Sequence, residues 1–247
     1  ENHALELKEQ FPDKCIAGPS GVGLLVPGHL KLGAIGGVTP PQIVGSALLT
    51  PGNVAVISTS GGMVGELIRS LANAGRRMSF AACVGGERFP ISSYTDFFLL
   101  AEADPETKGV LYYGELGGED EYEIAELIKN GFFTKPLVAY VAGTVDESFP
   151  ERTQFGHARA LAQNKSESAR AKRDILKSAG AVAPDSFEEF LNALKELPQT
   201  SFIDPSIELS SYLSRRASIL STRKFFSGDV STKEASDPYV RAILGVI

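Results

Sequence analysis

The sequence contains no tryptophan and only two cysteines, Cys15 and Cys83, among its 247 residues. Two isolated cysteines are too few for a disulfide framework or a zinc site, which predicts a reducing compartment, the cytoplasm, and no metal centre. No apolar run approaches the roughly 20 residues that cross a bilayer, and the first residues do not resemble a signal peptide. We therefore expect no membrane association.

An excess of positive charge is also missing. The chain carries 30 acidic and 24 basic residues, a formal net charge of -6, and this disfavours a non-specific nucleic-acid binder. Glycine, by contrast, is abundant: the 25 glycines gather in clusters where the backbone must turn sharply or approach a ligand. The length predicts one large domain with an appendage, or two small domains.

Short apolar runs alternate with helical patterns through the middle of the chain. The runs are almost continuously apolar, which predicts strands buried on both faces, and the alternation predicts an α/β fold with a doubly wound parallel sheet. The expected strands are 53–58, 79–84, 109–113, 136–142 and 181–183, and the expected helices are 63–74, 93–103, 119–130, 166–179 and 186–197. Ser186 is expected to cap the last helix, with Glu189 completing a capping box.

The two ends differ from this middle part. Residues 1–50 are rich in glycine and proline, which predicts an extended N-terminal segment with little regular structure. After Pro198 the helical periodicity weakens. We therefore divide the chain into a connecting segment (1–50), a main domain (51–197) and a C-terminal appendage (198–247).

Ser58–Gly62 closes an expected strand and opens an expected helix. Free N–H groups at a helix start attract anions, so Ser60, Gly61 and Gly62 are candidates for binding a phosphate or a carboxylate. The motif is neither a P-loop nor a dinucleotide-binding fingerprint, because the required lysine and third glycine are absent. A capped helix without a ligand remains the alternative.

His157 and Glu115 are the candidate catalytic residues. His157 follows Gly156 beyond the fourth expected strand, and a neutral imidazole is a nucleophile near pH 7. Glu115 ends the third expected strand, where a carboxylate would orient and stabilise the imidazole. The alternatives are an incidental histidine and an exposed glutamate at a helix start. Together with the anion site, the pair suggests phosphoryl transfer onto histidine, with Arg88 and Arg152 as further anion ligands.

Several motifs occur in the order found in one known family. They are Gly18-Pro-Ser-Gly-Val-Gly with Pro27-Gly28, Ser58–Gly62, Gly85-Gly-Glu-Arg-Phe-Pro90, Gly114–Gly118, Thr134-Lys-Pro136 and Gly156-His-Ala158. In this order the chain resembles the family of the succinyl-CoA synthetase alpha subunit and ATP-citrate lyase. Gln154-Phe-Gly-His-Ala158 and Asp185-Ser-Phe-Glu188 resemble the ATP-citrate lyase branch more closely.

The resemblance implies a flavodoxin-like fold and a ligase that joins a carboxylate to coenzyme A through a phosphohistidine. It implies that an ATP-grasp subunit or domain uses ATP-Mg to phosphorylate His157, while Glu115 steadies the imidazole. Ser60, Gly61 and Gly62 would bind phosphate close to the carboxylate substrate. Citrate is the expected substrate, giving citryl-CoA and then acetyl-CoA and oxaloacetate in the full enzyme, which is expected to be an oligomer.

The family also places a CoA-binding domain before Gly18, so residues 1–50 are expected to include the tail of that domain. Residues 51–197 would be the CoA-ligase domain, inactive in isolation. Residues 198–247 would form a linker and the start of a citrate-synthase-like module, which Arg215–Thr222 resembles.

Three positions depart from the family pattern. Arg159 replaces a glycine, Thr59 replaces an arginine, and Ser20-Gly21 replaces Asn-Cys. They leave two alternatives open: a succinyl-CoA synthetase-type ligase for another carboxylate, and a non-catalytic binding or regulatory module of the same fold.

Overall fold

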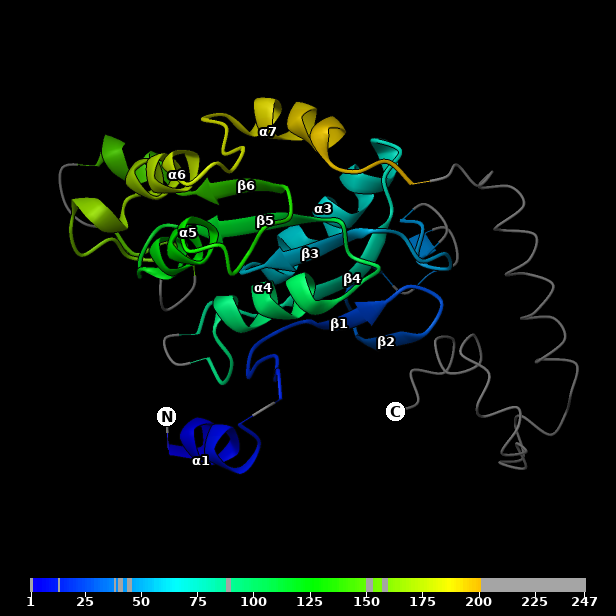
Figure 1. The fold of residues 1–247 in the computed structure, drawn as a ribbon. Coiled ribbons are helices and arrows are strands. Elements are labelled where there is room, and N and C mark those ends of the chain that lie inside the picture. Colours follow the sequence, from blue (N-terminus) through cyan, green and yellow to red (C-terminus); the bar gives the residue numbers. More distant parts are fainter. Residues whose placement is uncertain are drawn as a thin grey trace, which may run out of the picture.

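The apolar run that follows Asn53 forms the central strand of the sheet, β3 (Val54–Ser58), all of which is buried. Parallel neighbours flank it, β4 (Met78–Cys83) on one side and β5 (Gly109–Glu115) on the other, and β6 (Leu137–Ala142) pairs in parallel with β5. The computed structural model describes residues 2–200 except 13, 38, 40–41, 44–45, 88–89, 150–152 and 157–159. Within this part, the four strands β3 to β6 confirm the predicted parallel pairing (Figure 1).

Helices cover both faces of the sheet because side chains alternate along each buried strand. Val54 and Val56 pack with α3 (Gly61–Asn73) and α7 (Phe187–Ala193). Ala55 and Ile57 face the opposite way and belong to the core beneath the other three helices. These helices are α4 (Tyr94–Ala103), α5 (Asp120–Lys129) and α6 (Ala169–Ser178). The doubly wound arrangement is therefore confirmed.

The strand order β4-β3-β5-β6 contains one reversal of direction. The chain leaves β3 through α3 to reach β4, and then returns through α4 to reach β5 on the other side of β3. Right-handed crossovers in opposite directions place their helices on opposite faces, as observed for α3 and α4. The order is the flavodoxin-like one, and the switch point, where such sheets bind ligands, lies between β3 and β5.

The amino-terminal segment differs from the expectation. Residues 1–50 contain a helix, α1 (Asn2–Gln10), and an antiparallel hairpin of β1 (Gly23–Val26) and β2 (Leu30–Gly33). β1 also pairs antiparallel with β4, so the sheet is mixed and its six strands run in the order β2-β1-β4-β3-β5-β6. The prediction of little regular structure here is wrong: four-residue strands show no clear periodicity, but β1 pairs with the edge of β4 that would otherwise remain unpaired.

The carboxyl-terminal elements agree with the sequence with small differences. Ser186 and Glu189 form the predicted capping box at the start of α7. α6 begins at Ala169 because Ser168 caps it. The expected strand at 181–183 is a single parallel bridge between Val182 and Val138. Residues 201–247, and with them the C-terminal appendage beyond Thr200, lie outside the described residues.

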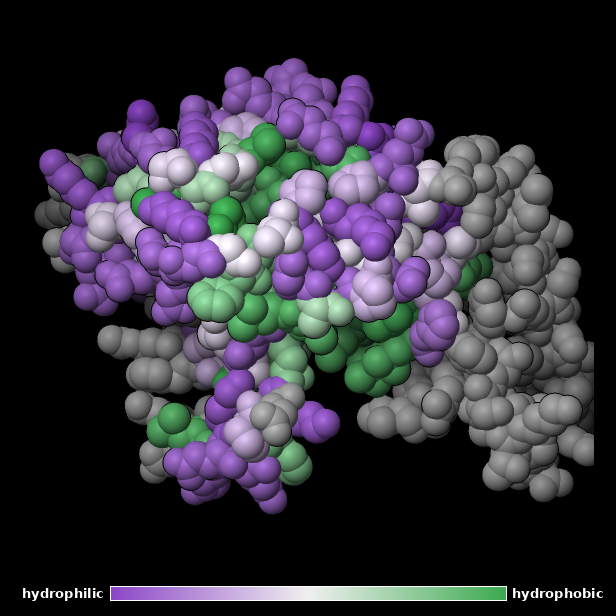
Figure 2. All heavy atoms as spheres, in the orientation of Figure 1, coloured by the Kyte–Doolittle hydropathy of each residue, from purple (hydrophilic) through white to green (hydrophobic). Residues whose placement is uncertain are grey.

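Apolar surface gathers over α4 and the hairpin (Figure 2). A half-open cavity of about 260 Å³ lies there between β1, β4 and α4. Its apolar lining includes Leu24, Val26, Leu30, Phe80, Phe97 and Leu100. None of the helices in the described part of the chain is long and apolar enough to cross a membrane.

If the hairpin is part of the main core, Leu25→Ala will lower the free energy of unfolding by about 2–4 kcal/mol, the usual cost of truncating a buried leucine. Leu25 is 1% exposed and lies in the same apolar cluster as Val54 and Val56. The matched control is Leu30→Ala in β2, where the leucine is 36% exposed and about 0.5 kcal/mol is expected. Urea unfolding of both variants measures the difference, and equal small losses would show that the hairpin unfolds independently.

Candidate active site

The switch point brings two of the predicted site segments together. Ser58 at the end of β3 is in register with Tyr113 of β5, two residues before Glu115. Because parallel strands end at the same edge, the β3–α3 loop and the β5–α5 loop leave the sheet side by side. The structure therefore places Ser60 and the first two residues of α3, Gly61 and Gly62, on the connection next to the one that begins after Glu115.

The β3–α3 loop is held by its own serines. The Ser58 hydroxyl donates to the Ser60 carbonyl at 3.0 Å and accepts the Ser60 N–H at 3.1 Å. The Ser60 hydroxyl accepts the Met63 N–H at 3.3 Å and so caps α3. Among the described residues, the N–H groups of Gly61 and Gly62 have no hydrogen-bond acceptor, and they start a helix whose dipole favours an anion.

The two glycines differ in what surrounds them. A Cβ at Gly61 would lie 2.5 Å from Cγ1 of Val22, so the segment before β1 packs against the start of α3. A Cβ at Gly62 would meet no atom of the described residues within 4 Å. The helix start is therefore bordered by the amino-terminal segment on one side and open on the other, which suits the entry of a ligand.

Thr59, at the position where the resembled family has an arginine, is bonded to the neighbouring strand β5. Its N–H and its hydroxyl both donate to the Tyr113 carbonyl, at 2.9 and 3.1 Å. The residue is buried and extends the pairing of β3 with β5 by one position. It therefore supplies no positive charge to the crevice.

Glu115 is the last residue of β5 and is half-buried. It is in register with Ala142 at the end of β6, and the following Leu116 N–H donates to the Ala142 carbonyl at 2.9 Å. Burial raises the pKa of Tyr113 to about 12, with Tyr140 and then the negative charge of Glu115 adding to the effect. Glu115 therefore lies at the same edge of the sheet from which the β6–α6 connection departs.

A buried lysine lies beneath this loop. Lys172 of α6 donates to the carbonyls of Glu115 at 2.9 Å and Gly117 at 2.6 Å. Its Nζ also forms a 2.5 Å ion pair with Glu121 of α5, and both side chains are 1% exposed. The Tyr112 hydroxyl donates to the other carboxylate oxygen of Glu121 at 2.9 Å.

Position 114 has room only for glycine, because the buried Glu121 carboxylate lies against its backbone. A Cβ there would lie 2.1 Å from Oε1 of Glu121. The glycine that sequence reasoning assigned to a ligand loop therefore makes room for a buried carboxylate.

His157 lies outside the described residues, as do Arg88, Arg152 and Arg159. The structure does describe the residues on either side of His157. The Phe155 N–H donates to the Ala160 carbonyl at 2.8 Å, and Gly156 has a φ of 63°, which favours glycine. The stretch that carries His157 is thus closed by a hydrogen bond at its base, with Ala160 buried.

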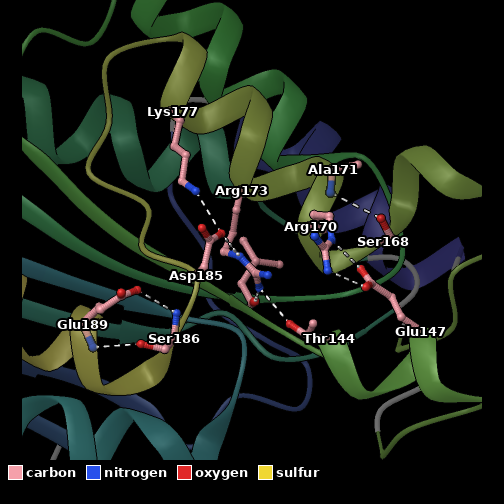
Figure 3. A network of polar contacts seen from close by, with 11 residues as sticks. Thr144, Glu147, Ser168, Arg170, Ala171, Arg173, Lys177, Asp185, Ser186 and Glu189 are labelled. Carbon is pink, nitrogen blue, oxygen red and sulfur yellow. Dashed lines mark hydrogen bonds and ion pairs between the residues drawn. The ribbon is translucent and has the colours of Figure 1, made fainter.

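The β6–α6 connection is anchored at its upstream end by two arginines of α6 (Figure 3). Arg173, 2% exposed, donates to the Val141 carbonyl at 2.7 Å and the Thr144 hydroxyl at 3.1 Å. Arg170 grips the Glu147 carboxylate with two hydrogen bonds of 3.1 and 2.8 Å. Glu147 therefore has a lowered pKa, first because of the Arg170 hydrogen bond.

Sequence reasoning missed Glu121, Lys172 and Arg173. Charged residues in an amphipathic helix normally face solvent, and these three are buried. The only available signal was the glycine at 114, which marks a position where another group approaches the backbone closely.

Comparisons with known proteins agree with this geometry. The family model described as CoA-ligase matches residues 57–182. A probable ATP-citrate synthase of Dictyostelium discoideum is 42% identical over 73% of this chain and 29% of its own length. Probable ATP-citrate synthase subunit 1 of Schizosaccharomyces pombe is 34% identical over 90% of this chain and 38% of its own length. The chain thus spans about a third of the length of these relatives.

Among solved structures, ATP citrate lyase from Methanothrix soehngenii, in complex with citrate and coenzyme A, superposes with a TM-score of 0.75. It is 33% identical in sequence, and the match covers 84% of this chain and 36% of that one.

The cap of α3 can be tested by removing one hydroxyl. Ser60→Ala will lower the free energy of unfolding by about 1 kcal/mol, because the Met63 N–H loses its acceptor. Ser70→Ala, in the last turn but one of the same helix, is the control and will be neutral or slightly stabilising, since alanine is the better helix former. Thermal or urea unfolding measures both, and an equal effect of the two changes would contradict the capping role.

Proposed function

Since the chain belongs to the CoA-ligase family, we propose that it acts as the CoA-ligase domain of an ATP-citrate lyase-like enzyme working through a phosphohistidine. One observation carries the proposal. The open start of α3 and the carboxylate of Glu115 lie on neighbouring parallel strands at the switch point, and the connection that carries His157 leaves the same edge after β6. An anion site, a carboxylate and a histidine at one edge suit phosphoryl transfer.

The proposed reaction has three steps. The γ-phosphoryl group of ATP-Mg, bound by an ATP-grasp subunit or domain, passes to a ring nitrogen of His157 and ADP leaves. The N–P bond then breaks as a carboxylate oxygen of citrate takes the phosphoryl group, giving an acyl phosphate. Finally the thiol of coenzyme A, held by a CoA-binding domain, loses its proton to solvent and attacks the acyl carbon, and phosphate leaves with the bonding electron pair.

Each proposed residue has a physical task. Glu115 accepts a hydrogen bond from the N–H of one imidazole nitrogen, which orients the ring and makes the other nitrogen a better nucleophile. The N–H groups of Gly61 and Gly62 and the dipole of α3 hold phosphate while it transfers, and Ser60 keeps the helix start in shape. Ser60 itself remains bonded to Met63, so its contribution to the anion is indirect.

The choice of citrate, the partners and the compartment rest on the relatives and on composition. The matched proteins are ATP-citrate synthases, and the solved relative holds citrate and coenzyme A. In the full enzyme, which would be an oligomer, citryl-CoA would then be cleaved to acetyl-CoA and oxaloacetate. The scarcity of cysteine favours the cytoplasm.

Thr59 favours a second candidate. Because this residue faces Tyr113 and brings no charge to the crevice, a different carboxylate, or a domain that binds without turning over, fits the same fold.

Phosphorylation of the full-length protein tests the central step. Incubated with its ATP-grasp partner and radiolabelled ATP, the wild type will gain acid-labile phosphate, and His157→Ala will gain none. Glu115→Gln keeps the size but removes the charge, so labelling will slow by about tenfold to a hundredfold, the value of one hydrogen bond to a charged group. Unchanged labelling of Glu115→Gln would remove its assigned role, and an unlabelled wild type would favour the non-catalytic alternative.

Substrate choice separates the two ligase readings. We expect the complete enzyme to discharge its phosphohistidine when citrate and coenzyme A are added, and to release acetyl-CoA. Succinate at the same concentration should leave the label in place. Discharge by succinate, with none by citrate, would show a succinyl-CoA synthetase-type ligase. The loss of label from His157 and the amount of acyl-CoA formed measure each substrate.

A further inference from the structure

We propose that Lys172 is a positioning residue, which fixes the loop that carries Glu115 to the downstream anchor of the connection that carries His157. The inference rests on the proposed function, because it assigns the source of the geometry that phosphoryl transfer needs.

Within the described structure, the polar contacts of the Lys172 side chain are confined to the Glu115 loop and to Glu121. Its ammonium group reaches three acceptors: the carbonyls of Glu115 and Gly117 and the carboxylate of Glu121. Two of its three protons are donated to the carbonyls, whereas the Glu121 oxygen contacts the ammonium group as an ion pair without a directed hydrogen bond. Two of the three acceptors are main-chain atoms of one short loop, on either side of Leu116. The Lys172 side chain therefore restrains the backbone of the loop in addition to neutralising the Glu121 carboxylate.

Stability alone does not account for such a group. Burying a lysine and a glutamate removes both from water, and apolar residues of similar volume are often as stable in their place. At 1% exposure each, the pair bears this desolvation cost almost completely. What an apolar side chain could not reproduce is the pair of hydrogen bonds to the Glu115 and Gly117 carbonyls.

The same loop is bonded to the residues that follow the His157 stretch. The Gly117 N–H donates to the Glu167 carbonyl at 2.9 Å. The Glu167 carboxylate in turn accepts the Gln163 N–H and the Asn164 side-chain amide, both at 2.9 Å. The chain from Gln163 to Lys172 is thus one hydrogen-bonded anchor that holds the Glu115 loop at two points.

Lys172 and the adjacent Arg173 hold opposite ends of the β6–α6 connection. Arg173 holds the upstream end, through Val141 and Thr144, whereas Lys172 holds the Glu115 loop against the downstream end. Successive residues of a helix point about 100° apart, so α6 reaches both ends at once. An error of about 1 Å in such an arrangement is enough to slow a reaction by about a hundredfold.

The test uses the full-length protein with its ATP-grasp partner and a pair of substitutions that balances the buried charge. Lys172→Met alone leaves Glu121 unpaired and will lower the thermal midpoint. Lys172→Met combined with Glu121→Gln removes both charges and keeps an acceptor for the Tyr112 hydroxyl, so the midpoint will return most of the way. We expect His157 labelling by this double variant to stay about tenfold or more below the wild type.

A double-mutant cycle with Glu115→Gln separates positioning from general loss of structure. If Lys172 acts through Glu115, adding Glu115→Gln to the balanced double variant will cost less than about threefold further, because the carboxylate is already misplaced. Amide exchange at Gly117 will also rise relative to the core strands. Leu194→Ala, a buried change far from the loop, is the control for lost stability and will leave the Gly117 amide protected.

The outcomes are distinct. The inference is overturned if the wild type is labelled and the balanced double variant is labelled equally fast. It is also overturned if the costs in the double-mutant cycle are additive. In either case the proposed function stands. An unlabelled wild type overturns the proposed function, and the inference with it.

Discussion

β3 pairs in parallel with both β4 and β5, and this pairing determines where the candidate site lies. Because the chain must cross to opposite sides of β3, right-handed crossovers place α3 on one face and α4 on the other. The loops that leave β3 and β5 then separate from each other over the edge of the sheet. The crevice between them holds the open start of α3 and the Glu115 loop, which is why two segments more than fifty residues apart meet there.

Two buried cations of α6 extend this arrangement to the segment that carries the histidine. Lys172 bonds the Glu115 loop and Arg173 bonds the end of β6 and Thr144. Such side chains are costly to bury, and main-chain carbonyls and carboxylates repay that cost only in one geometry. α6, the helix that follows the His157 connection, therefore fixes the position of both the Glu115 loop and the end of β6.

Local patterns predicted the central strands, the helices between them and the capping box of Ser186, because burial on both faces and a cap are properties of neighbouring residues. The hairpin at 23–33 escaped prediction because strands of four residues have no usable period, and β4, to which β1 pairs, is about fifty residues further along the chain. Lys172 escaped because a lysine in an amphipathic helix has the same sequence pattern whether it meets water or a buried glutamate. The placement of Ser60, Gly61, Gly62 and Glu115 followed from strand order, while the position of His157 itself stays a prediction.

By itself, the sequence determined the fold class and the alternation of strands and helices in residues 53–197, since these depend on periodicity and turn residues, and its side-chain types predicted the candidate site residues. Only the tertiary structure decided that the amino-terminal segment extends the sheet, that the Thr59 hydroxyl donates to the Tyr113 carbonyl, and that Lys172 donates to the Glu115 carbonyl. Each of these depends on a contact between residues distant in the chain. Local propensity carries no information about which distant carbonyl a hydroxyl or an ammonium group will meet.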